Sequence, residues 1–444
     1  MSAQPWLPPH RVPPGDADVA RSAVAKVSRR LLPFLFLLYN LNFLDRVNVG
    51  FAALEMNRDL GFGPAVYGLG AGIFFLGYCL FEVPSNMIML RTGARIWIAR
   101  IMVSWGLVAS AMMLVQTPAS FYTLRALLGV AEAGFFPGII FYLTYWYPAR
   151  ERARAYAWFL AAIPISGIVG GPISGALLDL HGHFGLAGWQ WLFLLEGVPS
   201  VIVGLLVLVV LPDRPADARW LAPAERAWLE RTLAEERAHA VAMHGTSFLR
   251  MLRNPTVWAL ATVYFLIIVG LYGVNLWLPQ LIKGVSGLGN FAVGVVSTVP
   301  YIVAALGMAV VGASSDRSGE RHWHIAGPAL VAAGGFVLAI AARDAVTLVT
   351  ALSLITFGVL SPIGPFWALP TVFLKEQAAA GGIALINSIG AIGGFVGPYL
   401  LGVVKDRTGG FGPALAFVAL LCVVAAGIAL RLRPPRPATE PAPA

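Results

Sequence analysis

Long apolar runs dominate this sequence and constrain its fold more than any other feature. A helix that crosses a bilayer needs roughly 20 apolar residues, and the 444-residue chain contains about twelve such runs. Charged residues make up only 12% of the chain, about half of what a soluble domain carries, so most of its surface must face lipid. The runs cover approximately residues 31–52, 65–89, 96–116, 120–143, 154–178, 189–211, 256–281, 291–313, 324–341, 345–373, 379–403 and 411–431.

The distribution of Lys and Arg predicts the topology. With the N-terminus inside, the inner segments hold 24 of the 31 Lys and Arg residues and the outer loops hold 5, while Arg46 and Arg125 lie inside spans. Because basic residues collect on the cytoplasmic side of a membrane protein, we expect both termini to be cytoplasmic. The same asymmetry explains the net charge of +9, so no nucleic-acid partner is expected.

A repeated motif divides the chain into similar parts. The pattern Gly-x-x-x-Asp-x-x-Gly occurs at residues 175–182, 312–319 and 402–409, and a degenerate copy occurs at 86–93. Each copy follows a predicted span, and three spans separate successive copies within each half. This spacing indicates two halves of six spans, each built from two units of three spans, which is the nested plan of secondary transporters.

We therefore predict an all-α membrane protein with twelve transmembrane helices in two pseudo-symmetric bundles of six. The largest polar break, at 213–255, holds seven Lys and Arg and six Asp and Glu, which is typical of a cytoplasmic connector with one amphipathic helix. The predicted parts are a cytoplasmic tail (1–30), an N-terminal bundle (31–211), a linker (212–255), a C-terminal bundle (256–431) and a second cytoplasmic tail (432–444).

Ionisable residues inside the spans are the first candidates for function, since each costs at least a few kcal/mol at mid-bilayer. Arg125 and Glu132 are two turns apart and share one face of their helix. The first and fourth spans can therefore bring two guanidinium groups and two carboxylates into one polar cavity. All of the candidates belong to the N-terminal half: Asp45, Arg46, Glu82, Arg125, Glu132 and Glu196.

This combination suits the binding of an organic anion coupled to protons. Arg stays charged and binds a carboxylate through two hydrogen bonds, and a buried Glu can load and release a proton near neutral pH. The alternative is that these charges form structural ion pairs that pin helices together. Neutral polar groups in other spans could also contact the substrate, namely Tyr78, Trp277, Trp367 and Asn387.

Several stretches together resemble the anion:cation symporter family of the major facilitator superfamily. They are Asn42-Phe-Leu-Asp45-Arg46-Val-Asn48, Gly77-Tyr78-x-x-Phe81-Glu82-x-Pro84, Arg125-x-x-x-Gly129-x-x-Glu132-Ala-Gly134, Trp191-x-Phe-x-x-Glu196-Gly and Asn387-Ser-x-Gly390-x-x-Gly393. The stretch Gly312-x-x-Ser315-Asp316-Arg317-x-Gly319-x-Arg321 resembles the general loop motif of the superfamily. Together these motifs cover nearly the whole chain.

The resemblance implies proton-driven uptake of a small organic anion in the bacterial inner membrane. It assigns substrate contact to Arg46, proton carriage or gating to Asp45 and Glu132, and the partner of Glu132 to Arg125. Permeases for tartrate, phthalate and 4-hydroxyphenylacetate form the branch that the chain resembles most. The remaining motif residues, Glu82, Asp316, Arg317 and Arg321, are expected to have gating or structural roles.

Two other classes of function remain open at this point. The Gly-x-x-x-Gly-Pro of the fifth span (167–172) resembles a motif of antiporters, so an anion exchanger with the same fold is the alternative. A membrane-bound enzyme or sensor is not expected, because the chain has no nucleotide-binding glycine loop, no appended catalytic domain and no His/Cys spacing typical of a metal site. We expect no cofactor and no metal, and a monomer.

Overall fold

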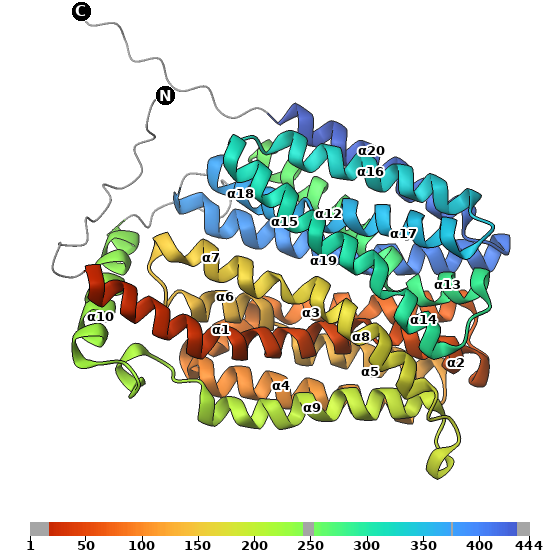
Figure 1. Cartoon of the computed structure of the whole chain (residues 1–444), viewed down its shortest axis with the longest axis horizontal. Coiled ribbons are helices and arrows are strands. Elements are labelled where there is room, and N and C mark those ends of the chain that lie inside the picture. Colours follow the sequence, from red (N-terminus) through yellow and green to blue (C-terminus); the bar gives the residue numbers. More distant parts are fainter. Residues whose placement is uncertain (1–16, 243–252, 374–375, 433–444) are drawn as a thin grey trace, which may run out of the picture.

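The chain folds into long helices that run side by side in two groups (Figure 1). The computed structural model describes residues 17–242, 253–373 and 376–432, and these residues contain no strand. The first group comprises α1 (Ala17–Val47), α2 (Val49–Asp59), α3 (Pro64–Thr92), α4 (Ala94–Ala111), α5 (Pro118–Glu132), α6 (Phe135–Leu143), α7 (Ala149–Leu160), α8 (Ala162–Leu178) and α9 (Gly188–Val210). The second comprises α12 (Pro255–Asn275), α13 (Leu278–Ser286), α14 (Asn290–Val296), α15 (Thr298–Ser318), α16 (His322–Ala341), α17 (Ala345–Leu360), α18 (Ile363–Phe373), α19 (Glu376–Thr408) and α20 (Gly412–Arg431).

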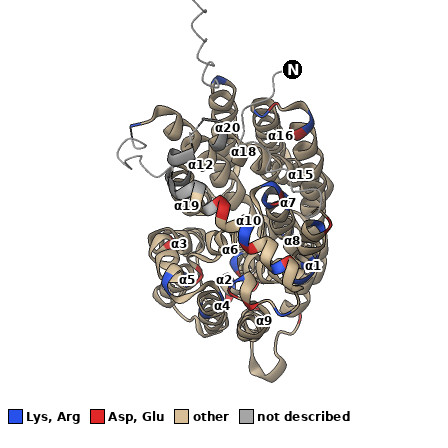
Figure 2. Cartoon of the chain, turned by 90° about the vertical axis from the view of Figure 1, so that its left-hand side faces the viewer, with Lys and Arg blue, Asp and Glu red and all other residues tan. Residues whose placement is uncertain are grey.

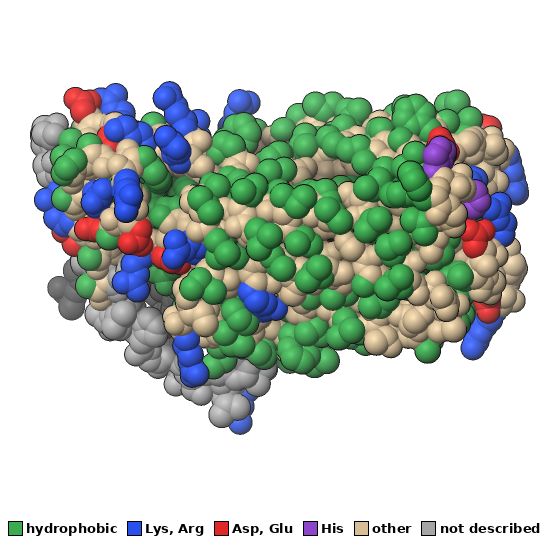
Figure 3. Space-filling model, turned by 90° about the horizontal axis from the view of Figure 1, so that it is seen from below, with side chains coloured by type: hydrophobic (Ala, Val, Ile, Leu, Met, Phe, Trp, Pro, Cys, Tyr) green, Lys and Arg blue, Asp and Glu red, His purple; other side chains and the backbone are tan. Residues whose placement is uncertain are grey.

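Eleven helical segments of the described chain are long and apolar enough to cross a membrane. On the face shown in Figure 3, large exposed hydrophobic side chains cover the middle of the molecule, and most charged side chains gather at its two ends. The first predicted span, 31–52, is not one of the eleven, because it is the part of α1 and α2 that carries buried Asn42, Asp45, Arg46 and Asn48. It nevertheless lies alongside the other helices (Figure 1).

The helix that holds the fourth predicted span is broken at its centre. α5 ends at Glu132, and the chain restarts as α6 after Gly134, whose φ of 85° lies in the left-handed region that favours glycine. Just before this break, a side chain at Gly129 would meet the carbonyl oxygen of Phe74 at 2.0 Å. The glycines therefore let α5 approach the backbone of α3 and place Glu132 at a helix end in the interior.

The last glycine of three motif copies directly follows a helix, and that of the fourth, Gly182, lies in the turn after α8. Gly93, Gly182, Gly319 and Gly409 have φ angles of 90°, 89°, 69° and 75°, and positive φ is the usual conformation just beyond a helix C-terminus. The prediction that each copy follows a span was wrong in detail, because three copies lie mostly within α3, α15 and α19. The repeat is therefore a helix-ending signal, with the acidic position in or next to the final turns.

The polar segment between the groups forms α10 (Pro223–Ala242), which packs against the end of the N-terminal group. Glu225 accepts hydrogen bonds from Ser22 Oγ at 2.6 Å and from Lys26 Nζ at 2.9 Å. Burial alone would raise the pKa of Glu225, but the hydrogen bonds from Lys26, Ser22 and the Ala222 amide outweigh it and lower that pKa. Glu236 binds Arg152 at 2.9 Å in the same way.

The N-terminal helix also begins earlier than predicted. α1 starts at Ala17 inside the segment expected to be a tail, because residues 17–30 continue the helical register and pack against α10. The predicted C-terminal tail (432–444) lies outside the described residues from residue 433 onward.

The two groups meet along a few helix pairs. α3 packs against α19, α8 against α14 and α15, and α2 against α13. Glycines allow the backbones to touch along these seams: a side chain at Gly68 would meet Pro398 O at 2.6 Å, and one at Gly171 would meet Gly294 O at 2.5 Å. The site described next lies where these seams surround the end of α1.

Candidate functional site

A buried ion pair between α1 and α5 forms the centre of the candidate site. Arg46 donates from Nε to Glu132 Oε1 at 2.9 Å, and its Nη2 also donates to the same oxygen. Arg46 is 8% exposed and Glu132 is fully buried. Among the described residues the second carboxylate oxygen of Glu132 has no hydrogen-bond partner, so this acid is held by one oxygen only.

The other faces of the Arg46 guanidinium contact neutral groups from both halves. Nη1 donates to the hydroxyl of Tyr272 in α12 at 3.1 Å, and Nη2 donates to Asn42 Oδ1 at 3.4 Å. The rings of Phe74 and Tyr78 lie 5.4 and 5.3 Å from the guanidinium carbon, within the range of a cation–π contact. Tyr78 is thus placed beside Arg46, as its predicted role in binding requires.

Arg125 does not pair with Glu132, which differs from the predicted arrangement. Its Nε and Nη2 donate to the carbonyl oxygens of Gly70 and Ala71 at 3.2 and 3.1 Å, and its guanidinium lies 5.0 Å from the Phe74 ring. Arg125 therefore ties α5 to the backbone of α3. Arg125 lies on the interior face of α5, as predicted. On that face it contacts two carbonyl groups in place of Glu132.

Asp45 and Arg46 point to different places, because successive residues of a helix are about 100° apart. Asp45 accepts hydrogen bonds from Trp105 Nε1 at 2.9 Å and from Ser200 Oγ at 2.6 Å. It is thus buried among α4 and α9, behind the ion pair. Glu196, also on α9, accepts from Ser174 Oγ at 2.7 Å.

Glu82 of α3 forms a hydrogen bond that connects the two halves. Asn387 of α19 donates from Nδ2 to Glu82 Oε1 at 2.6 Å, while the other oxygen of Glu82 has no hydrogen-bond partner in the described part of the chain. Cys79, one turn earlier, donates from its thiol to the carbonyl of Ser388 at 3.5 Å. Glu82 and Asn387 were predicted separately, and the structure brings them together as one contact between the bundles.

The two tryptophans lie apart from the ion pair. Trp277 is buried beside Tyr67, with ring centroids 4.7 Å apart, and donates to Pro398 O at 3.2 Å. Trp367 of α18 packs edge-on against Tyr264 at 4.9 Å. In the described part of the chain neither forms a hydrogen bond or ring contact with Arg46, and their roles in binding remain predictions.

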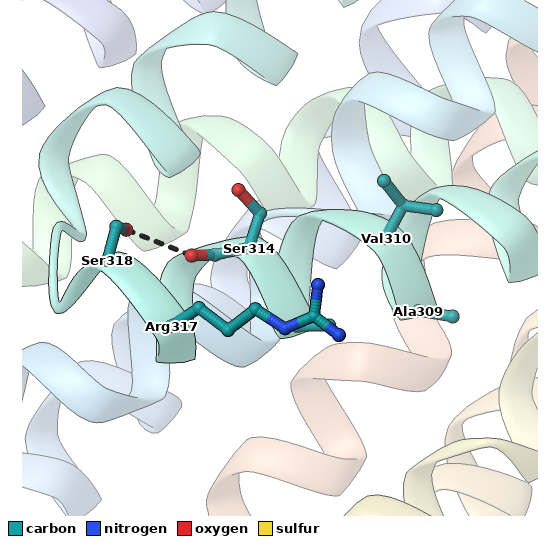
Figure 4. Close-up of a pocket in the computed structure, with 6 residues that line it drawn as sticks. Ala309, Val310, Ser314, Arg317 and Ser318 are labelled. Carbon is teal, nitrogen blue, oxygen red and sulfur yellow. Dashed lines mark hydrogen bonds between the residues drawn. The ribbon is translucent and has the colours of Figure 1, made fainter.

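The motif residues of α15 lie at the end of that helix. Arg321 pairs with Asp316 at 2.7 Å and also donates to Ser315. Arg317 points along an open pocket of about 620 Å³ that is lined by one face of α15 (Figure 4). The residues lining it are Ala309, Val310, Ala313, Ser314, Arg317 and Ser318, none of which belongs to the predicted substrate set.

Sequence reasoning missed the contributions of Tyr272 and Asn42. Asn42 lies one turn before Arg46, so helical spacing could have placed it on the same face. Tyr272 carries no comparable signal, since it is one aromatic residue within an apolar run of the other half. Among the described residues, no group of three or more His, Cys, Asp or Glu could hold a metal ion.

The arrangement of helices and buried charges can be compared with known proteins. Residues 35–398 match the family described as Major Facilitator Superfamily. The chain belongs to the Major Facilitator Superfamily. As a member of this superfamily, it is a multi-pass membrane transporter rather than an enzyme.

Relatives of this superfamily member span almost its whole length. A protein of Agrobacterium vitis named "Putative tartrate transporter" is 52% identical over 94% of this chain and 96% of its own. The "Quinolone resistance transporter" of Acinetobacter baumannii is 40% identical over 91% and 93%. The "Inner membrane transport protein RhmT" of Escherichia coli is 37% identical over 93% and 95%.

A solved structure of the superfamily has the same fold. The bacterial homologue of the human lysosomal transporter Spinster, in an inward-facing and unoccupied conformation, aligns with a TM-score of 0.73. It is 19% identical and covers 92% of this chain and 96% of its own. This likeness shows the helical architecture alone.

Proposed function

We propose that this transporter imports a small organic anion together with protons through the bacterial inner membrane. The observation that carries the proposal is the buried ion pair between Arg46 and Glu132. Arg46 also donates a hydrogen bond to the hydroxyl of Tyr272 from the opposite bundle. A monomer would contain the complete site, since both bundles belong to one chain.

The coupling follows from the shared use of one guanidinium. Arg can bind a carboxylate through two parallel hydrogen bonds, and Arg46 now directs Nε and Nη2 to one oxygen of Glu132. When a substrate carboxylate takes the place of Glu132, that acid is left buried without its cation. A buried, unpaired carboxylate is so unfavourable that it takes up a proton. Substrate and proton therefore enter the site together.

Movement between the two membrane faces follows from the same contacts. With substrate and proton bound, contacts to the substrate replace the hydrogen bonds of Arg46 to Tyr272 and Glu132, and the two bundles can rock around the site. Release of the anion on the inner side restores the ion pair and expels the proton. Asp45 and Glu196 lie behind the site and could hold a further proton, while Glu82 and Asn387 link the bundles.

The names of relatives support a carboxylate as the substrate. Two relatives that are 52% and 51% identical are both named for tartrate. Tartrate carries two carboxylates and two hydroxyl groups. Arg46 can hold one carboxylate, and Asn42, Tyr78, Tyr272 and Asn387 offer neutral hydrogen-bonding groups nearby or across the bundle seam.

The surface supports the predicted orientation. Lys and Arg crowd the end of the molecule that carries α10, whereas fewer lie at the opposite end (Figures 2 and 3). Basic residues collect on the cytoplasmic side, so we assign the α10 end, both termini and the linker to the cytoplasm. The end formed by α2, α13 and α14 then faces the periplasm.

The test is uptake into proteoliposomes that contain the purified full chain. Labelled tartrate, galactonate, phthalate and hydroxyphenylacetate are offered with and without an inward proton gradient. We expect gradient-driven uptake of at least one carboxylate, loss of that uptake in Arg46→Ala, and loss of acid stimulation in Glu132→Gln. Uptake of no carboxylate, or uptake that ignores the gradient, would overturn the proposal.

An anion exchanger is the second candidate, and one feature favours it. Gly171 of α8, which belongs to the antiporter-like motif, lies at the close seam with Gly294 of α14. An exchanger would show rapid counterflow of labelled anion into preloaded liposomes and no net uptake into empty ones. A Glu132→Gln symporter should also retain counterflow, so the empty-liposome arm of the wild type decides between the two.

A further inference from the structure

Four polar side chains join the two bundles at the end opposite α10. Glu55 of α2 and His181, in the turn between α8 and α9, come from the N-terminal bundle, while Lys283 of α13 and Asn290 of α14 come from the C-terminal bundle. Asn290 donates from Nδ2 to Glu55 Oε1 at 2.7 Å, and its Oδ1 accepts from Lys283 Nζ at 2.5 Å. The amide of Asn290 thus connects a carboxylate of one bundle to an ammonium of the other.

Glu55 has one oxygen left over. It is only 8% exposed, and its Oε2 is buried without a hydrogen-bond partner among the described residues. His181 Nδ1 lies 3.6 Å from this oxygen. The space between them is small, because Gly188 packs so closely that a side chain there would meet Glu55 Oε2 at 2.8 Å.

His181 is held in a form that cannot use this oxygen. The amide of Gly188 donates to His181 Nδ1 at 3.4 Å, so Nδ1 is the acceptor nitrogen and a neutral ring carries its proton on Nε2. Once the ring is protonated, Nδ1 becomes a donor. It must then leave the Gly188 amide, and Glu55 Oε2 is the free acceptor beside it.

The surrounding charges do not compete for this contact. The other charged groups on α2, on α9 and in the turn after α8 are Arg58, Asp59, Asp179, His183 and Glu196. Asp59 contacts Arg58 and the Trp189 indole, His183 contacts Leu180 O, and Glu196 accepts from Ser174. α1 and α3 also pack against α2, and their buried charges, Asp45, Arg46 and Glu82, contact Ser200, Glu132 and Asn387. Within the described chain, none of these groups forms a hydrogen bond or ion pair with the four side chains that join the bundles here.

The same four side chains lie where the backbones of the two bundles approach closely. A side chain at Gly175 of α8 would meet the carbonyl oxygen of Asn290 at 2.7 Å, and one at Gly50 of α2 would meet Leu276 O at 3.0 Å. This end cannot open while those backbones touch. Opening must therefore separate Glu55 from Asn290.

We propose that Glu55, His181, Lys283 and Asn290 form an acid-sensitive latch that holds this end of the transporter shut. A protonated His181 gains the contact to Glu55 Oε2 within its own bundle, and this neutralises the carboxylate that accepts the hydrogen bond of Asn290 from the other bundle. A hydrogen bond to a neutralised carboxylate is weaker than one to a free ion, so acid on this side favours opening, and the latch strengthens as the histidine loses its charge. In transport terms, which rest on the proposed function, the latch eases reopening when the outer medium is acidic.

The test measures the distance between the bundles directly and needs no substrate. Spin labels are attached to Arg58→Cys on α2 and Val285→Cys on α13, in a Cys79→Ser, Cys422→Ser background reconstituted in lipid nanodiscs. Double electron–electron resonance spectroscopy then gives the fraction of molecules with the longer, open distance between the labels at pH 7.5 and pH 5.5. We expect that fraction to rise roughly two- to fivefold in acid, the range for a partly exposed ion pair.

The variants separate the latch from general effects of acid. His181→Gln should give the same open fraction at both pH values, and Glu55→Gln should raise that fraction at both. His183→Gln is the matched control, because it removes the neighbouring histidine that has no contact with Glu55, and it should behave as the wild type does.

A pH-dependent distance that persists in His181→Gln, or no change with pH in the unaltered latch, would overturn the inference. Failure of proton-driven uptake alone would leave these distances unchanged, so the failure of the latch and the failure of the proposed symport are distinguishable.

Discussion

The two bundles follow one repeat plan but bury different chemistry. The N-terminal bundle buries seven ionisable side chains: Asp45, Arg46, Glu55, Glu82, Arg125, Glu132 and Glu196. The buried polar side chains of the C-terminal bundle, as far as the structure describes it, are all neutral and include Asn275, Ser297, Ser315, Thr356 and Ser361. One half therefore holds the charges, and the other half moves against it.

Three contacts between the bundles show what this division achieves. Arg46 meets Tyr272, Glu82 meets Asn387, and Glu55 meets Asn290. In each case an ion of the N-terminal half meets a neutral dipole of the C-terminal half. A hydrogen bond to a charged group contributes about 1.5–3 kcal/mol, so such contacts hold the bundles together yet can break during each transport cycle. A buried ion pair across the seam would be far harder to break.

Removal of Arg46 should have the largest effect on this division. Arg46→Ala leaves Glu132 buried without a cation and removes the anchor for the substrate, so we expect uptake to fall by roughly a hundredfold or more. Arg46→Lys keeps the charge but not the two-pronged geometry, and it should recover only a small part. Initial uptake rates in proteoliposomes with matched protein content measure both. A fully active Arg46→Ala would remove Arg46 from the site.

Arg125 should behave differently from Arg46 although both are buried. Its contacts are carbonyl groups of α3, so Arg125→Met should lower the thermal stability of the detergent-solubilised protein by several degrees, each lost charge-assisted bond contributing about 1.5–3 kcal/mol. The apparent affinity of the folded fraction should stay within about twofold. A large rise in KM with unchanged stability would instead place Arg125 at the substrate.

The next largest effect is expected from a charge placed on the neutral side of the seam. Asn387→Asp sets a second carboxylate against Glu82, and we expect roughly tenfold slower uptake at pH 7.5 with partial recovery in acid, where one of the two acids is protonated. Asn387→Ala is the control that removes the hydrogen bond without adding charge. Equal, pH-independent losses in both variants would mean that charge repulsion is not the cause.

The smallest effect is expected at Tyr272. Tyr272→Phe removes one hydroxyl from Arg46 and keeps the ring that packs 4.3 Å from Phe75, so KM should change about two- to tenfold, as for one hydrogen bond. Tyr301→Phe, on α15, is the matched control because Tyr301 has no hydrogen bond to Arg46. An equal shift in both variants would argue against a special role for Tyr272.

The sequence supported the architecture better than it supported the contacts. Apolar runs and the repeated glycine motif predicted the helices and their ends, because burial and positive φ leave direct signals in residue type. The same signals predicted which residues are buried and charged. They placed Arg46 and Glu132 in one site, and the structure joins them.

Partners on other helices could not be read from the sequence. The face shared by Arg125 and Glu132 was predicted, but the rotation of α5 against α3 decides that Arg125 meets carbonyl groups. Likewise, neighbouring positions 45 and 46 were assigned to one cavity although a helix turns them apart. Glu55 and Asn290 were not singled out, since each is an ordinary polar residue at the end of a predicted span.

The attachment of α10 has a practical consequence for structural work. Glu225 and Glu236 fasten this helix to α1 and to Arg152 of α7, and both partners belong to the N-terminal bundle. A rigid binding protein raised against α10 would therefore mark the position of one bundle from the solvent. In electron microscopy of this small particle, such a fiducial would reveal the rotation of the other bundle without any change inside the membrane.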